Sequence, residues 1–85
     1  MSSSAGEGTA RAVHVHVSER ELMVTLSDGR RIGVPLDWYP RLRDATSDQQ
    51  AHWELLGAGE GIHWPEVDED LSVAGLLAGR RAPDA

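Results

Sequence analysis

Carboxylates are concentrated in one short segment near the C-terminal end of the sequence. Four of them fall within five residues: Glu66, Asp68, Glu69 and Asp70. The segment follows a Trp-Pro corner and precedes an apolar stretch that begins at Leu71. Concentrated negative charge can bind a cation, attract a basic protein surface, or stabilise the start of a following helix. The residue types alone leave these three uses open.

Metal binding has weak support in the residue spacing. A calcium loop needs alternate carboxylates with a central glycine and a terminal bidentate Glu, and the acidic segment lacks the last two features. The nearby histidines His14 and His16 have no cysteine or third histidine beside them, as a zinc motif would require. We expect no metal and no cofactor. A metal- or small-ligand-binding module built from His63, Glu66 and Asp68 is the alternative function.

Catalytic patterns are equally weak. No serine lies in a Gly-x-Ser-x-Gly setting, and the glycine-rich stretch 57–61 lacks the Gly-Lys-Ser/Thr ending of a phosphate-binding loop. Two carboxylates can act as acid and base only in a cleft that separates their pKa values, and a domain of this size rarely encloses one. We therefore expect a protein that is not an enzyme.

The charge is distributed unevenly along the chain. Residues 1–43 carry six Arg and five acids, whereas residues 44–79 carry eight acids and no Arg or Lys. Phosphate backbones are bound largely through Lys and Arg, so nucleic acid is an unlikely partner. An acidic surface attracts a basic protein, and exposed aromatic residues add binding energy. The predicted partner-binding residues are Glu60, Glu66, Asp68, Glu69, Trp38 and Tyr39.

The length of 85 residues sets the expected organisation. We predict disordered tails at residues 1–11 and 80–85 and a single domain at 12–79. Cysteine is absent, so the three tryptophans must supply much of the core, and a homodimer would add further burial. The sequence has no apolar run long enough to span a membrane and no signal peptide. We expect a soluble, cytoplasmic protein.

Three segments alternate between apolar and polar residues, as half-buried strands do. They cover residues 12–17, 22–26 and 31–36, and the first would turn Val13, Val15 and Val17 to one face. Short polar connections, the second containing Asp28-Gly29, predict hairpins between them. Both turn residues of such a hairpin need a positive φ. The result is a three-stranded antiparallel meander with one apolar face to cover.

The rest of the chain predicts short helices and a short strand. Pro40 suits the first turn of a helix over 41–45, and Thr46 with Gln49 predicts a capping box opening a helix that reaches Trp53 or Leu55, with Leu56 turned inward. A glycine-rich turn leads to a strand at 62–64 on the edge of the meander. A last helix covers 71–79, capped by Asp70 or Ser72. The fold class is α+β: the meander plus one or two short strands, packed with two or three short helices.

Two longer segments resemble a known family. Pro35-Leu36-x-Trp38-Tyr39-Pro40-Arg41-Leu42 and Ile62-His63-Trp64-Pro65-x-x-Asp68-Glu69-Asp70 are similar to the DUF2442 family, and the likeness extends over about residues 13–79. The resemblance implies a small bacterial or phage-associated α+β domain without defined catalytic residues. Its members are often encoded beside DUF4160 proteins, and the pair has been proposed as a toxin–antitoxin module.

By that analogy this chain would be the antitoxin, which neutralises a small basic toxin by direct contact. Some members are fused to helix-turn-helix regions, so a transcription-regulator accessory domain is a further alternative. This sequence has no such extension. Its only basic cluster in the domain is formed by Arg30, Arg31, Arg41 and Arg43. We therefore expect a non-catalytic protein-interaction domain.

Overall fold

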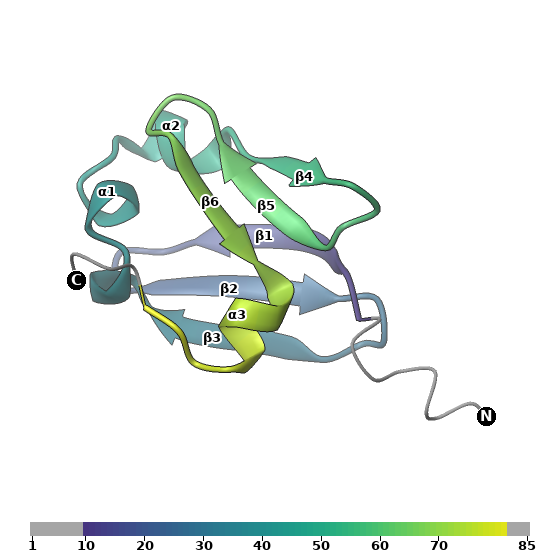
Figure 1. Cartoon of the computed structure of the whole chain (residues 1–85). Coiled ribbons are helices and arrows are strands. Elements are labelled where there is room, and N and C mark those ends of the chain that lie inside the picture. Colours follow the sequence, from purple (N-terminus) through teal and green to yellow (C-terminus); the bar gives the residue numbers. More distant parts are fainter. Residues whose placement is uncertain (1–9, 82–85) are drawn as a thin grey trace.

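The computed structural model of the chain describes residues 10–81, which form two antiparallel three-stranded sheets and three short α-helices (Figure 1). This arrangement confirms the α+β class and the three-stranded meander. The tails predicted at 1–11 and 80–85 lie mostly outside the described residues. No helix within 10–81 is long and apolar enough to cross a membrane.

The first sheet consists of three consecutive strands in the order β1-β2-β3. They are β1 (Ala12–Val17), β2 (Glu21–Leu26) and β3 (Arg31–Pro35). Leu22, Val24 and Leu26 alternate along β2, and each is at most 1% exposed. They share the buried face because every second side chain of a strand points to the same side. The first hairpin closes where the Ser18 N–H donates to the Glu21 carbonyl at 2.9 Å.

The second hairpin uses a different turn from the one predicted. The Gly29 N–H donates to the Leu26 carbonyl at 3.0 Å, and Gly29 alone in this turn has a positive φ, of 93°. The prediction that Asp28 would also adopt a positive φ is wrong. Asp28 instead accepts a hydrogen bond from the Arg30 N–H at 3.0 Å, which lowers the pKa of its carboxyl group, with a further contribution from the Arg30 side chain. This turn therefore needs one residue with a positive φ, Gly29 at its last position, and not the two that the predicted hairpin turn requires.

A bulge changes the orientation of Val13 at the start of β1. The pairing register between β1 and β2 shifts between Ala12 and His14, and one extra residue reverses the side to which the preceding side chain points. Val13 is therefore 51% exposed, whereas Val15 is 3% exposed. The prediction that Val13 shares the buried face of Val15 is wrong.

The second sheet, in the order β4-β5-β6, was only partly anticipated. Its strands are β4 (Glu54–Leu56), β5 (Gly61–Trp64) and β6 (Glu69–Ser72). The prediction that residues 62–64 pair with the edge of the meander is wrong, because β5 is the central strand between β4 and β6. Leu56, expected to point inward, is 42% exposed because it lies on the same side of β4 as Glu54, the side that faces solvent. The glycine-rich turn precedes β5 as predicted.

The helices are shorter than predicted but start where their caps indicate. They are α1 (Pro40–Arg43), α2 (Ser47–Ala51) and α3 (Val73–Leu77). The capping box of α2 is confirmed, because Thr46 accepts from the Gln49 N–H and Gln49 accepts from the Thr46 N–H. Ser72, one of the two caps considered for α3, accepts from the Gly75 N–H at 2.9 Å. The residues after Ala51 leave the helix to join β4.

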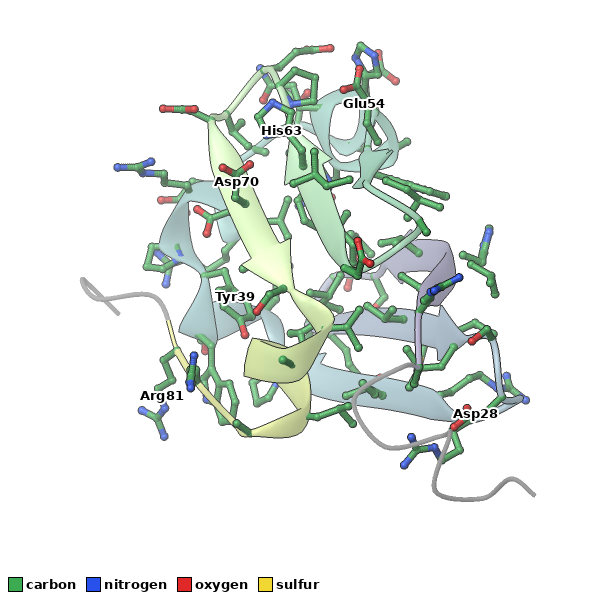
Figure 2. All side chains as sticks on the ribbon, turned by 45° about the vertical axis from the view of Figure 1, so that its right-hand side comes forward. Asp28, Tyr39, Glu54, His63, Asp70 and Arg81 are labelled. Atoms are coloured by element: carbon green, nitrogen blue, oxygen red, sulfur yellow. The ribbon has the colours of Figure 1, made fainter. Side chains whose placement is uncertain are left out.

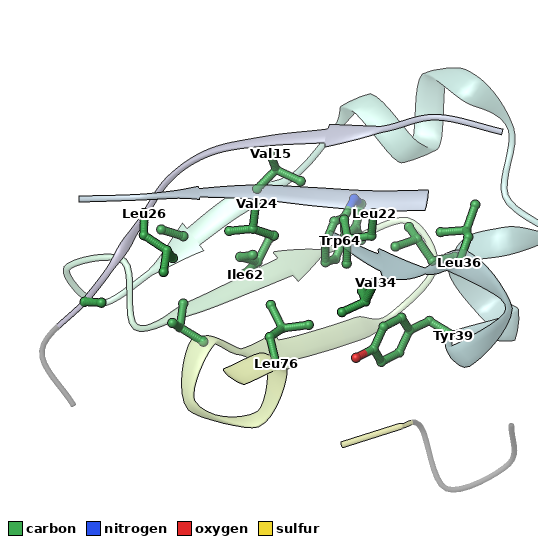
Figure 3. Close-up of a cluster of buried hydrophobic side chains, with 14 residues drawn as sticks. Val15, Leu22, Val24, Leu26, Val34, Leu36, Tyr39, Ile62, Trp64 and Leu76 are labelled. Carbon is green, nitrogen blue, oxygen red and sulfur yellow. The ribbon is translucent and has the colours of Figure 1, made fainter. Parts of the chain in front are cut away.

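The core lies between the two sheets and is closed at one side by α3 (Figure 3). Trp64 and Ile62 project from β5 onto the buried face of the meander, and both are completely buried. The Trp64 indole N–H donates to the Gln50 carbonyl at 3.0 Å, which ties β5 to α2. Trp53 is only partly buried against this core. A large aromatic ring with its polar N–H satisfied gives a small domain much of its buried surface.

The ordered chain continues beyond residue 79. Tyr39 is 2% exposed, and its hydroxyl donates to the Arg80 carbonyl at 2.9 Å. The Arg81 guanidinium lies 4.8 Å from the centre of the Trp38 ring, a distance suited to a cation–π contact. Residues 80 and 81, which were predicted to begin the C-terminal tail, therefore contact Tyr39 and Trp38 of the domain.

Candidate interaction surface

The outer side of the second sheet carries the polar side chains that β5 does not bury. Because Ile62 and Trp64 point into the core, His63 between them points outward. The cross-strand partners of His63 are Glu54 on β4 and Asp70 on β6. Opposite residues in antiparallel strands lie about 5 Å apart at Cβ, so one imidazole lies between two carboxylates in a row across the sheet.

His63 Nδ1 and Asp70 Oδ1 lie in hydrogen-bond contact. Figure 2 shows both side chains on the solvent side of the sheet, with Glu54 at the same end of the molecule. Asp70 keeps 65% of its side-chain surface exposed and His63 keeps 26%. Glu54 is exposed. The pair fixes the orientation of the ring and leaves negative charge facing the solvent.

A second histidine–carboxylate pair lies at the end of the same sheet. His52, just before β4, contacts Glu66 in the β5–β6 turn through Nδ1 and Oε2. The hydrogen bond to Glu66 and the charge of this carboxylate raise the pKa of His52, and the charge of Glu54 raises it further. Glu54 therefore links the two pairs. We call Glu54, Glu66 and Asp70, with His52 and His63 among them, the acidic face.

The raised pKa of His52 gives a prediction for its titration. Replacing Glu66 with Gln is expected to lower the pKa of His52 toward about 6.5, the value of a free histidine. The His52–Glu66 pair stabilises the folded state fully below the pKa that His52 has in the unfolded chain. This stabilisation disappears as the pH rises through the raised pKa of His52 in the folded state. Histidine ring NMR signals recorded against pH measure the pKa of His52 in the wild type and in the Glu66→Gln variant. Glu60→Gln is the control and leaves His52 unchanged; equal His52 titrations in wild type and Glu66→Gln would contradict the assignment.

Two of the other predicted contact residues are exposed near this surface. Asp68 lies in the β5–β6 turn with a φ of 55°, and its carbonyl accepts from Arg41 Nη1 at 3.1 Å. Its carboxylate is therefore presented by a backbone conformation that few residues other than Gly, Asn and Asp adopt. Glu60 lies in the β4–β5 turn, where its Oε1 accepts from the Ala58 N–H at 3.3 Å. Both belong to turns at the ends of β5.

Two of the predicted partner contacts, Glu69 and Tyr39, are buried in the structure and offer little surface to a partner. Glu69 pairs with Trp64 across β5 and β6 and shares its inward direction, so it is only 9% exposed. Burial raises the pKa of Tyr39, and the charge of Glu69 raises it further. These residues lie beside a cavity of about 160 Å³ that Arg80 also lines. Tyr39 therefore packs next to Arg80, to whose carbonyl it donates.

Trp38 offers less surface than predicted. The ring is partly buried, and Arg81 covers one of its faces. Glu54 and His52 were not predicted from the sequence, and His63 and Asp70 were predicted in other roles. The signal that identifies His63 is the alternation within residues 61–64, which turns His63 outward once Ile62 and Trp64 are assigned to the core.

The alternative metal site is not assembled in the described part of the chain. His63 pairs with Asp70, and Glu66 pairs with His52, so His63, Glu66 and Asp68 do not converge. No group of three potential ligands within residues 10–81 could hold a metal ion. Two of the four arginines of the basic cluster, which a DNA-binding role would need, form ion pairs: Arg30 with Asp28 and Arg43 with Asp44. A cationic surface is not formed by these pairs.

Comparison with known proteins gives one family and two similar structures. A model of a family described as "Protein of unknown function (DUF2442)" matches residues 12–82. A crystal structure of a Rhodospirillum rubrum protein of unknown function is 33% identical, with a TM-score of 0.74 over 86% of this chain and 90% of that one. An NMR structure of an uncharacterised Chromobacterium violaceum protein is 26% identical, with a TM-score of 0.75 over 89% and 72%. No curated protein matches.

Proposed function

The chain belongs to the DUF2442 family, and on that premise we propose that it is a non-catalytic domain that binds a basic protein through its acidic face. The acidic face presents three exposed carboxylates on one uncovered sheet and its adjoining turn. Two of them flank His63 across neighbouring strands, and the third holds His52. This placement on one surface is the observation that carries the proposal.

The charge of the surroundings supports a basic partner. Residues 44–79 contain no Arg or Lys, so no cation of this segment neutralises the acidic face. A surface of one sign speeds the encounter with a partner of opposite sign and disfavours others. The same charge opposes phosphate backbones. His52 neutralises Glu66 when its ring is protonated, and because the pKa of His52 is raised, the negative charge at this pair increases as the pH rises through that raised pKa.

The pairing of DUF2442 with DUF4160 proteins suggests which protein this basic partner is. We propose that the acidic face neutralises a basic DUF4160 protein in the cytoplasm, with this chain as the antitoxin-like member of the pair. The carboxylates supply long-range attraction, and the sheet with its β5–β6 turn sets their relative positions. No bond is made or broken in this role, so the proposal requires a stoichiometric complex rather than turnover.

Co-expression tests this proposal directly. The chain is produced with an affinity tag beside a DUF4160 protein, and the complex is purified in low salt and passed over a sizing column. We expect a stoichiometric complex whose dissociation constant rises steeply between 50 mM and 500 mM NaCl, because salt screens surface charges. Separate elution of the two proteins in low salt, at micromolar concentrations, would overturn the assignment of this partner.

A further inference from the structure

The edge strand β6 of the second sheet borders a cavity of about 160 Å³. The facing walls are formed by Tyr39, by α3, and by the chain at Arg80 and Arg81. Figure 2 shows Asp70, Tyr39 and Arg81 one below another on this side of the molecule. The cavity is smaller than the roughly 300–1,000 Å³ of sites for drug-sized molecules, so it suits a small molecule. We call it the β6 cavity.

The hydrogen-bond pattern of β6 shows which main-chain groups face the cavity. The Val73 N–H donates to the Glu60 carbonyl at 2.9 Å, and this bond fixes the alternation along the register of β5 and β6. In an antiparallel pair, every second residue exchanges bonds with its partner strand, and the residues between direct their N–H and C=O away. Those residues are Asp70 and Ser72. Both line the cavity, so β6 presents main-chain N–H donors to it.

Glu69 brings a carboxylate to the wall of the β6 cavity. Its side chain shares the inward direction of Trp64, and the residue is only 9% exposed. Burial raises the pKa of Tyr39, and the charge of Glu69 raises it further, so the carboxylate lies close enough to act on the Tyr39 hydroxyl. A carboxylate with so little exposure favours hydrogen-bond donors or a cation beside it. An ammonium group inside the cavity supplies both.

Arg80 and Arg81 bring positive charge to the same cavity. Their segment is fastened, because the Tyr39 hydroxyl donates to the Arg80 carbonyl and the Arg80 N–H donates to the Gly75 carbonyl, each at 2.9 Å. The Arg81 guanidinium lies over the Trp38 ring. Stacking of this kind occupies the flat face of a guanidinium, and its N–H groups remain able to bind a carboxylate. The cavity therefore has walls of opposite charge.

We propose that the β6 cavity binds a free α-amino acid. The ammonium group of the ligand lies at the Glu69 carboxylate. The carboxylate of the ligand accepts hydrogen bonds from the Ser72 N–H and from the guanidinium groups of Arg80 and Arg81. One carbon atom separates the two charges of an α-amino acid, so both can enter a small cavity. This binding goes beyond the proposed function, because none of it involves the basic partner.

The mixture of charges disfavours simpler ligands. A phosphate or a lone carboxylate would meet the negative charge of Glu69, and a metal ion or an amine would meet Arg80 and Arg81. Like charges brought together oppose binding. A ligand that carries both charges offers each wall a group of opposite sign, and it leaves neither wall with a desolvated charge facing a group that cannot pair with it.

Amide NMR spectra of the full chain, recorded with each of the twenty protein amino acids at millimolar concentration, test this proposal. We expect at least one of them to give saturable shifts at Asp70, Ser72 and Gly75. Its N-acetyl derivative lacks the ammonium charge and its C-terminal amide lacks the carboxylate, so each derivative should bind at least about tenfold more weakly.

Three results would overturn the proposal. Equal binding of the N-acetyl derivative would show a site for a carboxylate alone, and equal binding of the amide would show a site for an amine alone. The absence of shifts at Asp70, Ser72 and Gly75 with all twenty amino acids would show that the cavity takes no such ligand.

Two variants test the site from the protein's side. Glu69→Gln keeps the shape of the side chain and removes its charge. Arg80→Gln combined with Arg81→Gln removes the positive charges and covers the case in which Glu69→Gln does not fold. Both are expected to weaken binding of the amino acid by about tenfold or more, although they change the net charge of the chain in opposite directions. Arg20→Gln, exposed in the β1–β2 turn, is the control and should bind like the wild type. Wild-type affinity in a folded variant of the cavity contradicts the proposal.

The cavity and the proposed function can fail separately. Glu54 and Glu66 belong to the acidic face and do not line the β6 cavity. Glu54→Lys combined with Glu66→Lys should therefore weaken the complex with the DUF4160 protein and leave the affinity for the amino acid unchanged. If the amino acid binds and the DUF4160 protein does not, only the proposed function is wrong; the reverse result overturns only the amino acid site.

Discussion

Replacing Trp64 with alanine is expected to destabilise the domain by about 3–5 kcal/mol, the usual cost of removing a large aromatic side chain from a core. Trp64 is completely buried between the sheets, and its indole N–H is bonded to the Gln50 carbonyl. The substitution therefore leaves a cavity and an unsatisfied carbonyl. Small domains have total stabilities near the lower end of about 5–15 kcal/mol, so a large fraction of the variant is expected to be unfolded at 25 °C.

Urea denaturation followed by far-ultraviolet circular dichroism measures this effect. Leu77→Ala is the control, because Leu77 is 47% exposed on α3 and its loss should change the free energy of unfolding by about 0.5 kcal/mol or less. Trp64→Phe keeps an aromatic ring and loses the indole bond, and should fall between the two. A Trp64→Ala variant as stable as Leu77→Ala would show that the two sheets are not held together by this residue.

Charge reversal on the acidic face is expected to weaken the complex with the basic partner by about tenfold to a hundredfold. The variant combines Glu54→Lys, Glu66→Lys and Asp70→Lys. All three side chains are exposed, and exposed ion pairs contribute little to stability, so the fold should persist. Asp68 is left unchanged because its positive φ would strain a lysine. Glu69 is left unchanged because it is buried.

The kinetics of binding show how the loss arises. Charges around an interface act mainly on the association rate and its salt dependence, so most of the change should appear in the association rate constant. Surface plasmon resonance at two salt concentrations measures both rate constants. In 500 mM NaCl the wild-type and charge-reversed proteins should differ much less, because the Debye length is then shorter than at physiological salt. A loss that is independent of salt would indicate damage to the surface shape instead of lost attraction.

The first sheet could be predicted from the sequence because its information is local. Leu22, Val24 and Leu26 alternate without interruption, and glycine marks the second turn at Gly29. The bulge before His14 could not be predicted, since an extra residue in one strand is visible only against the strand that pairs with it. The capping box at Thr46 was found because both of its partners lie within four residues of sequence.

The second sheet could not be predicted in full because pairing with β5 overrides local preference. Glu54-Leu55-Leu56 reads as the end of a helix, since Glu and Leu favour helices. Glu69-Asp70-Leu71-Ser72 reads as a helix cap, since acidic residues are poor strand formers. In the structure both segments lie beside β5 and form edge strands. Edge strands tolerate charge, and even use it to prevent unwanted pairing.

The candidate surface, like the fold, could be predicted from the sequence only in part. The sequence located the acidic segment, but not which of its carboxylates are presented to a partner. Adjacent residues of a strand point to opposite faces, so the register of β6 alone decides that Asp70 is exposed and Glu69 is buried. The contribution of Glu54 required the pairing of β4 with His63, which brings together residues nine positions apart in sequence. Long-range pairing of this kind leaves no local signal.

The central claim is that a basic partner recognises the position of the acidic face and not merely the negative charge of the chain. The most direct test compares the charge-reversed variant with Glu19→Lys, Glu21→Lys and Asp37→Lys combined, which reverses three exposed acids elsewhere. Both variants change the formal net charge of −6 by the same amount. We predict that the dissociation constant for the DUF4160 protein rises at least about tenfold more in the acidic-face variant. Equal losses in the two variants would contradict the claim.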